Sequence, residues 1–159
     1  MRDAIKAIQH SGVTLIELLV VIAIVAIAAT LGSPSFVGLI NAQRVKSSAS
    51  TLHSALVLTR SEAMKRNANV ALSPVDSANW SKGWNIVNPD AATVSTIPYL
   101  SAYQDVGNIT ISGPTNVVYQ GSGRVTGNTA ASFTVSASGT SLTRCVKVSL
   151  SGTPSIMKC

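Results

Sequence analysis

The sequence has 159 residues, a net charge of +6 and a low content of charged (11%) and aromatic (4%) residues. With only six Asp and Glu residues, it offers no paired carboxylates, no nucleophile–base pair and no phosphate-binding loop, so we expect no enzymatic activity. Its two cysteines and two distant histidines (His10, His53) predict neither a metal site nor a cofactor. The basic excess permits a polyanionic partner, although a solvated basic face is the more common explanation.

The N-terminal region contains a long apolar run. Between Val13 and Leu31 only Thr14, Glu17 and Thr30 are not apolar. A helix of this length spans about 28 Å, close to the roughly 30 Å thickness of a bilayer's hydrocarbon core. We therefore predict a membrane-spanning helix over residues 13–31. An ionised carboxylate within lipid is unfavourable, so Glu17 is a candidate functional residue.

The residues at the start of this run carry a resemblance. Gly12, then Thr14-Leu15-Ile16-Glu17-Leu18 and the apolar run, resembles the class III signal of type IV pilins and pseudopilins. The resemblance implies that residues 1–12 are a leader, that a prepilin peptidase cuts between Gly12 and Val13, and that the new N-terminus is methylated. Val13 stands where the family usually has Phe. The helix would anchor the subunit in the inner membrane and later pack in the core of a filament.

Glu17 has a specific role under this resemblance. Cleavage creates an ammonium group at Val13, and an unpaired carboxylate in a filament core would be unfavourable. We expect Glu17 to pair with the amine of a neighbouring subunit and to set the axial register. The expected partners are therefore the prepilin peptidase, other pilin or pseudopilin subunits and the inner membrane.

Two other interpretations of the N-terminus stay open. Arg2 and Lys6 followed by an apolar run and Ala26-Ile27-Ala28 also fit a secretory signal peptide, with a mature start near Ala29. The run is longer than the usual apolar region of roughly 7–15 residues, and Glu17 lies inside it. A simple single-pass anchor explains the length but gives Glu17 no role.

A second helical segment is predicted over residues 32–67. Gly32-Ser33-Pro34 opens it, and the proline should bend or loosen the helix because it removes a backbone donor. Apolar positions then recur at three- and four-residue steps, as in an amphipathic helix that packs one face on a sheet. This stripe comprises Val45, Ala49, Leu52, Leu56, Thr59 and Ala63, widened by Ala55 and Met64.

Residues 68–159 read as a β-rich domain, which we expect to lie in the periplasm. Short β-branched runs alternate with Gly, Pro and Asn turn signals. The predicted strands are Val70–Ser73, Gly83–Val87, Ile109–Ser112, Val117–Gln120, Ser132–Ala137, Arg144–Leu150 and a last one at Ser155–Lys158. The stretch Asp76–Gly107 looks least regular and should hold a long loop, while Trp80 and Trp84 should close a core. The fold class is therefore α+β, a long helix packed on a mostly antiparallel sheet.

The two cysteines, Cys145 and Cys159, lie near the C-terminus. Outside the cytoplasm an oxidising compartment favours a disulfide between them, and two free thiols are the alternative. The closed loop would hold about 15 residues and stabilise the fold by roughly 3 kcal/mol.

Residues after the apolar run narrow the resemblance to the FimT/GspH group of minor pilins and minor pseudopilins. Members of this group help to assemble or initiate a type IV pilus or a type II secretion pseudopilus, and these residues do not separate the two systems. The matching residues are Leu56–Ala63, Arg66-Asn67, Trp80, Gly83-Trp84, Gly123-Arg124 and the cysteine pair.

DNA binding for natural transformation is the alternative function. Some FimT-like pilins bind DNA through a Gly-Arg-x-Arg segment between their two cysteines. The matching place here reads Gly152-Thr153-Pro154-Ser155 and lacks both arginines. The cations that remain as candidate phosphate contacts are Arg124, Arg144, Lys147 and Lys158.

Overall fold

The computed structural model describes residues 12–77, 79–90, 92–104, 107–127 and 130–159, and of residues 30–35 it describes the backbone alone. The chain divides into two compact units, Met1–Phe36 and Val37–Cys159. One helix, α1 (Leu15–Arg66), is followed by the strands. These are β1 (Val70–Asp76), β2 (Asn79–Val87), β3 (Tyr99–Gln104), β4 (Ile109–Ser112), β5 (Val117–Tyr119), β6 (Ala131–Ala137), β7 (Arg144–Val148) and β8 (Pro154–Met157).

In the first unit, α1 begins at a capped end. The backbone N–H of Glu17 donates to Thr14 Oγ1 at 3.3 Å, and the N–H of Leu18 donates to the Thr14 carbonyl at 3.2 Å. Thr14 is therefore the N-cap, which satisfies a donor that the helix leaves unpaired. The large apolar side chains from Val13 to Ile27 are 48 to 78% exposed.

The structure describes only part of the N-terminal region for which predictions were made. The leader lies outside the described residues except for Gly12, and so do the side chains of Gly32-Ser33-Pro34, where a bend is predicted. The backbone there is helical, so Pro34 does not end α1. Among the described residues, no helix has both the length and the apolar character needed to cross a membrane. The membrane-spanning helix over residues 13–31 stays a prediction.

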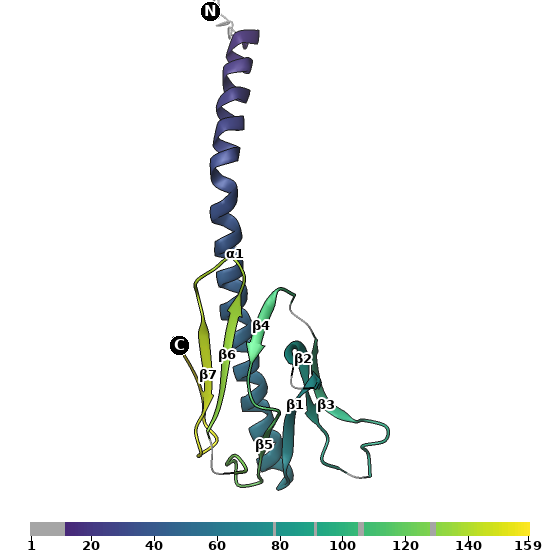
Figure 1. The fold of residues 1–159 in the computed structure, drawn as a ribbon. Helices are drawn as coiled ribbons and strands as arrows, with labels where there is room; N and C mark the ends of the chain where they lie inside the picture. The colour runs from purple at the N-terminus through teal and green to yellow at the C-terminus, as the bar shows by residue number, and fades with distance from the viewer. Residues whose placement is uncertain (1–11, 78, 91, 105–106, 128–129) are drawn as a thin grey trace, which may run out of the picture. The chain divides into compact units, whose positions relative to one another are not determined.

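The second unit contains two antiparallel sheets of four strands each. The first sheet has the order β3-β2-β1-β5 and the second has the order β4-β6-β7-β8. Figure 1 shows the strands gathered along residues 37–66 of α1. The α+β fold class is thus confirmed, with the strands divided over two sheets.

The second unit buries one face of α1. Val45, Ala49, Leu52, Leu56 and Ala63 are all fully buried, which confirms the predicted stripe. Thr59 is buried as well, because its hydroxyl donates to the carbonyl of Ala55 at 2.6 Å and needs no solvent. The inclusion of Met64 in this stripe was wrong: it is 46% exposed and lies beside the turn at Gly123 instead.

Trp80 joins the two sheets. It is fully buried on β2 of the first sheet, and its ring meets Phe133 of the second sheet edge-on at 4.8 Å between centroids. Its indole N–H donates to the Pro114 carbonyl at 2.6 Å, so the buried polar atom has a partner. Trp84 is also buried and stacks on Tyr103 of β3 at 4.6 Å. The prediction that the two tryptophans close a core is confirmed.

The predicted strands all occur, β4 with the predicted bounds and the others with one or both ends shifted, and one strand was missed. β3 lies within Asp76–Gly107, the stretch expected to hold a long loop, and β2 begins four residues before its predicted start at Gly83. β3 is an edge strand whose burial does not alternate regularly, so its sequence carries little period-two signal. The loop that remains there, between β2 and β3, is shorter than expected.

Candidate functional site

The residues around the predicted cleavage point are open to solvent. Gly12 is exposed, and a Cβ atom added to it would meet no atom within 4 Å. Its φ is not among the positive values of the chain, so the backbone does not require glycine either. Val13 is 71% exposed. The described structure therefore gives no steric or backbone reason for glycine at position 12.

Glu17 is the third residue of α1. Its side chain is exposed, and within the described part of the chain it forms no ion pair. A carboxylate in the first turn favours the helix because it faces the positive end of the helix dipole. Thr14 and Glu17 also match the capping signature of Ser or Thr followed three residues later by Glu. Sequence reasoning missed this local role, although the spacing was visible.

A second arrangement was not predicted from the sequence. Arg60 of α1 lies at the two turns that follow β5 and β7. Its Nε donates to the Gly123 carbonyl at 3.0 Å, one terminal nitrogen donates to the Ser151 carbonyl at 3.3 Å, and the other donates to Thr153 Oγ1 at 3.4 Å. One guanidinium thus ties a turn of each sheet to the helix. No local pattern signals this contact, because its partners lie at least 63 residues away in sequence.

Glycine is required where these two turns meet. Gly152 has φ +82°, and a Cβ added there would clash with the carbonyl oxygen of Gly123. Tyr119 lies beside Gly152 and is fully buried, and its hydroxyl has no hydrogen-bond partner among the described residues. Burial raises the pKa of Tyr119 to about 12, although the nearby Arg60 charge acts to lower it.

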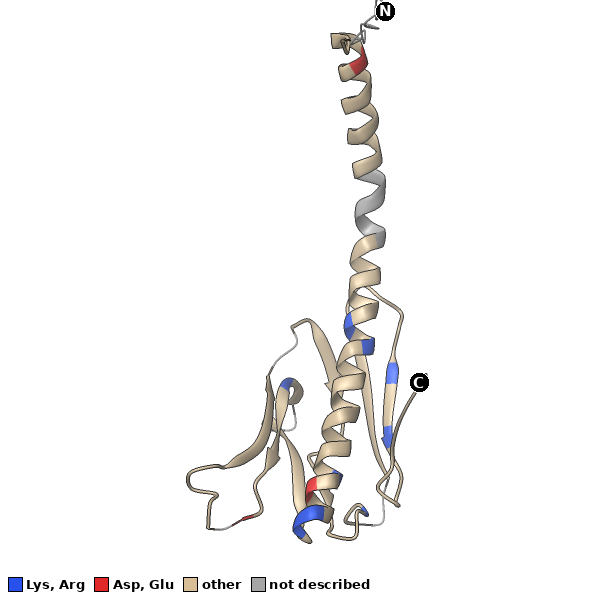
Figure 2. Cartoon of the chain, turned by 180° about the vertical axis from the view of Figure 1, so that it is seen from behind, with Lys and Arg blue, Asp and Glu red and all other residues tan. Residues whose placement is uncertain are grey.

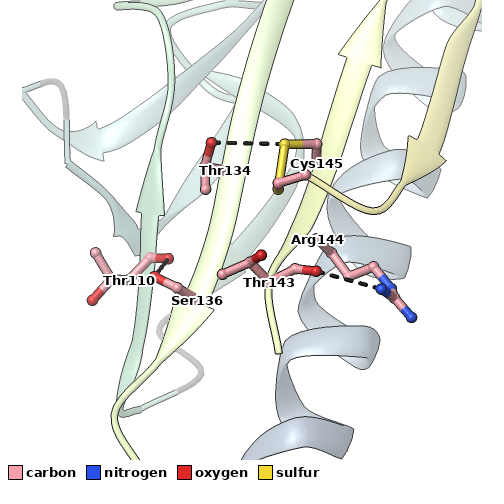
Figure 3. Close-up of a disulfide and its surroundings, with 7 residues drawn as sticks. Thr110, Thr134, Ser136, Thr143, Arg144 and Cys145 are labelled. Carbon is pink, nitrogen blue, oxygen red and sulfur yellow. Dashed lines mark hydrogen bonds between the residues drawn. A yellow bond between two sulfur atoms is a disulfide. The ribbon is translucent and has the colours of Figure 1, made fainter. Parts of the chain in front are cut away.

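The predicted disulfide is present. Cys145 on β7 is bonded to Cys159, with 5.1 Å between their Cα atoms. Figure 3 shows Thr134 of β6 beside the Cys145 sulfur, at 3.9 Å, and the Arg144 side chain near the Thr143 carbonyl, at 3.4 Å. The bond fixes the C-terminal residues to the start of β7.

The structure brings together two of the four candidate phosphate contacts. Arg144 and Lys158 line a pocket of about 350 Å³ together with Thr140, Ser141 and Thr143. Lys147 faces the other side of its strand, since Arg144 is paired with the buried Val135 and Lys147 with the exposed Ser132. Arg124 is exposed in the turn that Arg60 holds. Within the described ranges, no cluster of His, Cys, Asp and Glu could hold a metal ion.

Comparison with models of known protein families shows to which family this chain belongs. The family model described as Type II transport protein GspH matches residues 48–152, well over half of the chain. The chain belongs to the GspH family. A second model, the prokaryotic N-terminal methylation motif, matches residues 9–33 of this GspH-family chain and so includes Gly12, Val13 and Glu17. A search of curated proteins finds no match.

Solved structures show the same fold. The type IV minor pilin FimU of Pseudomonas aeruginosa is similar in two crystal forms, each with a TM-score of 0.61 and 19% identity, over 70 and 74% of this chain and 91 and 89% of FimU. The minor pseudopilin EpsH from the Type 2 Secretion System of Vibrio cholerae has a TM-score of 0.56 and 13% identity, over 72% of this chain and 97% of EpsH. The GspH-family chain therefore has a pilin-like fold.

Proposed function

We propose that this GspH-family chain is a minor pilin or minor pseudopilin subunit. A prepilin peptidase cuts it between Gly12 and Val13 and methylates Val13, and the mature subunit takes part in the assembly or initiation of a type IV pilus or a type II secretion pseudopilus. The observation that carries the proposal is the methylation motif over residues 9–33, which precedes the GspH match over residues 48–152 in the same chain. The exposed Gly12, which the fold does not require, supports it.

The start of α1 supports attachment to the inner membrane. Large apolar side chains are exposed at Val13 and along the helix from Leu15 to Ile27, and an exposed apolar surface of this extent marks a contact with lipid or protein. We infer that lipid covers these side chains before assembly and that helices of other subunits cover them afterwards. The second unit would then lie in the periplasm, where the disulfide is stable.

Processing is tested by the intact mass of the chain expressed with and without a prepilin peptidase. We expect the product to begin at methylated Val13. Gly12→Ala should block cleavage and leave the fold unchanged, because the added methyl group meets open space. Val13→Phe, which restores the usual family residue, is the matched control and should be cleaved. A mature start near Ala29, or retention of residues 1–12 beside an active peptidase, would contradict the proposal.

The role of Glu17 is tested by variants that remove its charge and, separately, by a variant that removes the Thr14 cap of the same helix. Glu17→Gln keeps a polar side chain at the third helical position but cannot form an ion pair with the Val13 amine of a neighbour. We expect it to lower incorporation into filaments while membrane insertion continues. Thr14→Ala removes the cap and keeps the charge, so it should assemble. Normal incorporation of both Glu17→Gln and Glu17→Ala would exclude the ion pair.

DNA binding is kept as a second candidate because Arg144 and Lys158 line one pocket, together with Thr140, Ser141 and Thr143. Phosphate contacts from these cations would give an affinity that falls steeply with salt. A gel shift at low and moderate salt tests this, comparing Arg144→Gln/Lys158→Gln with Arg124→Gln/Lys147→Gln, which removes the same charge outside the pocket. Absence of a shift by the unsubstituted chain at low salt would end this candidate.

A further inference from the structure

The first turns of α1 in the second unit expose large apolar side chains although the helix is firmly held there. Val37, Leu39 and Ile40 are 56, 66 and 50% exposed. Asn41, one helical turn after Val37, is 5% exposed, and its amide donates to the Ser138 carbonyl at 2.8 Å. The helix is thus docked on the side of Asn41, while Leu39 and Ile40 point away from that side and Val37 lies at its border.

Two cations follow these apolar residues on the same exposed faces. Val37, Ile40 and Arg44 are spaced three and four residues apart and share one stripe of the helix, while Leu39 and Lys46 share another. Both cations are exposed. Each stripe therefore changes from apolar to basic within about 10 Å along the helix axis.

These cations have no acidic neighbour on their helix. The sequence contains no Asp or Glu between Glu17 and Glu62, and in the described structure the ion pairs of α1 join Glu62 to Lys65 and Arg66 at its far end. Figure 2 shows α1 basic at these first turns and mixed in charge at its C-terminal end. The charge of Arg44 and Lys46 is therefore available to an external anion.

We propose that this surface, formed by Val37, Leu39, Ile40, Arg44 and Lys46, binds the anionic phosphate headgroups of a bilayer. The aliphatic side chains enter the outer edge of the lipid, and the two longer side chains reach the phosphates, as cationic residues near membrane interfaces do. A nucleic acid offers phosphates but no layer that covers Leu39 and Ile40, so a bilayer fits the whole surface better. The inference rests on the membrane attachment proposed above.

The lysines of one molecule provide the test. The full chain is placed in lipid nanodiscs of phosphatidylcholine alone or mixed with phosphatidylglycerol, and each lysine is footprinted with an amine-reactive reagent and mass spectrometry. With anionic lipid, the modification rate of Lys46 should fall about fivefold, the factor equivalent to about 1 kcal/mol per cation at an anionic surface. Lys147, exposed on β7, is the internal control and should keep its rate.

Salt and substitution sharpen the test. High salt should restore the Lys46 rate, because screening shortens the reach of the headgroup charge. Arg44→Gln should reduce the protection of Lys46, whereas Arg124→Gln, which removes the same charge elsewhere, should not. Both positions are exposed, so the variants should fold, and the fluorescence of the buried Trp80 and Trp84 verifies this.

Other results would overturn the inference in distinguishable ways. Equal Lys46 rates in the two kinds of nanodisc refute headgroup binding and leave the pilin proposal intact. Protection by an oligonucleotide as strong as that by anionic lipid assigns the surface to nucleic acid. Protection that rises with protein concentration regardless of lipid assigns it to a second copy. A chain that enters neither kind of nanodisc refutes membrane attachment and this inference together.

Discussion

The two parts of α1 use the same residue types in opposite ways. In the first unit Val20 and Ile24 are 52 and 61% exposed, whereas in the second unit Leu52 and Leu56 are fully buried against the sheets. Burial of a leucine side chain contributes roughly 1.5–3 kcal/mol to folding, so only the second part of the helix stabilises its own unit. The apolar residues of the first part therefore matter for contacts with lipid or other subunits. Composition alone does not distinguish these two uses.

Truncation of one leucine in each part tests this comparison most directly. Leu52→Ala should destabilise the second unit by about 2–5 kcal/mol, because it leaves a cavity in a packed core. Leu19→Ala, the matched substitution at a half-exposed site, should change the free energy of unfolding by less than about 0.5 kcal/mol. Denaturant unfolding followed by tryptophan fluorescence measures this, because both tryptophans lie in the second unit. Similar losses from both variants would contradict the comparison.

Loss of the disulfide should affect the second unit alone. Cys145→Ser with Cys159→Ser frees the C-terminal residues and should destabilise the unit by about 3 kcal/mol, the value expected for a loop of this length. The same unfolding assay measures the loss, with the reduced unsubstituted chain as its control. An unchanged midpoint would show that the contacts of β8 alone hold the C-terminus.

Arg60 should contribute through polar contacts within the same unit. Arg60→Ala leaves two backbone carbonyls without a donor, and we expect a loss of about 1–3 kcal/mol. Arg60→Lys should restore little, since an ammonium group cannot match the planar guanidinium that spans three acceptors. Arg66→Ala is the control: it breaks an ion pair at the helix surface and should cost less than about 1 kcal/mol. An equal loss from Arg60→Ala and Arg66→Ala would remove the special role of Arg60.

Tyr119 gives the second unit a dependence on alkaline pH. Its pKa is about 12 in the folded chain and about 10 when unfolded, so the unfolded chain loses its proton first. The stability linked to this hydroxyl is therefore complete below pH 10 and is lost as the pH rises towards 12. Tyr119→Phe should flatten this decline and cost little at neutral pH, because the hydroxyl has no partner among the described residues. Unfolding midpoints across this range provide the measurement.

The smallest effect is expected at the start of the helix in the first unit. Thr14→Ala removes an N-cap, a loss of about 1 kcal/mol that is confined to the first turns of α1. Hydrogen exchange should become faster near Glu17, while the fluorescence-detected unfolding of the second unit stays unchanged. A shift in that unfolding midpoint would show that the two parts of the helix are coupled.

Local patterns predicted much of this molecule. The buried stripe of α1 from Val45 to Ala63 was readable because helical periodicity repeats over several turns. The disulfide was predictable because the chain has two cysteines and we expected this domain to lie in an oxidising compartment outside the cytoplasm. β3 was missed because an edge strand with irregular burial has weak alternation. The division into two sheets, and the contact of Arg60 with both, depend on pairings far apart in sequence, which no local pattern records.

The contact between Gly123 and Gly152 has a consequence for engineering this family. Because no side chain fits between the two turns, the loops carrying these glycines behave as one exchangeable module. In a chimera that imports only one of the two loops from a relative, the imported loop would not pack correctly against the native loop. Grafts that transfer both loops with the arginine-bearing turn of the helix should preserve the native geometry.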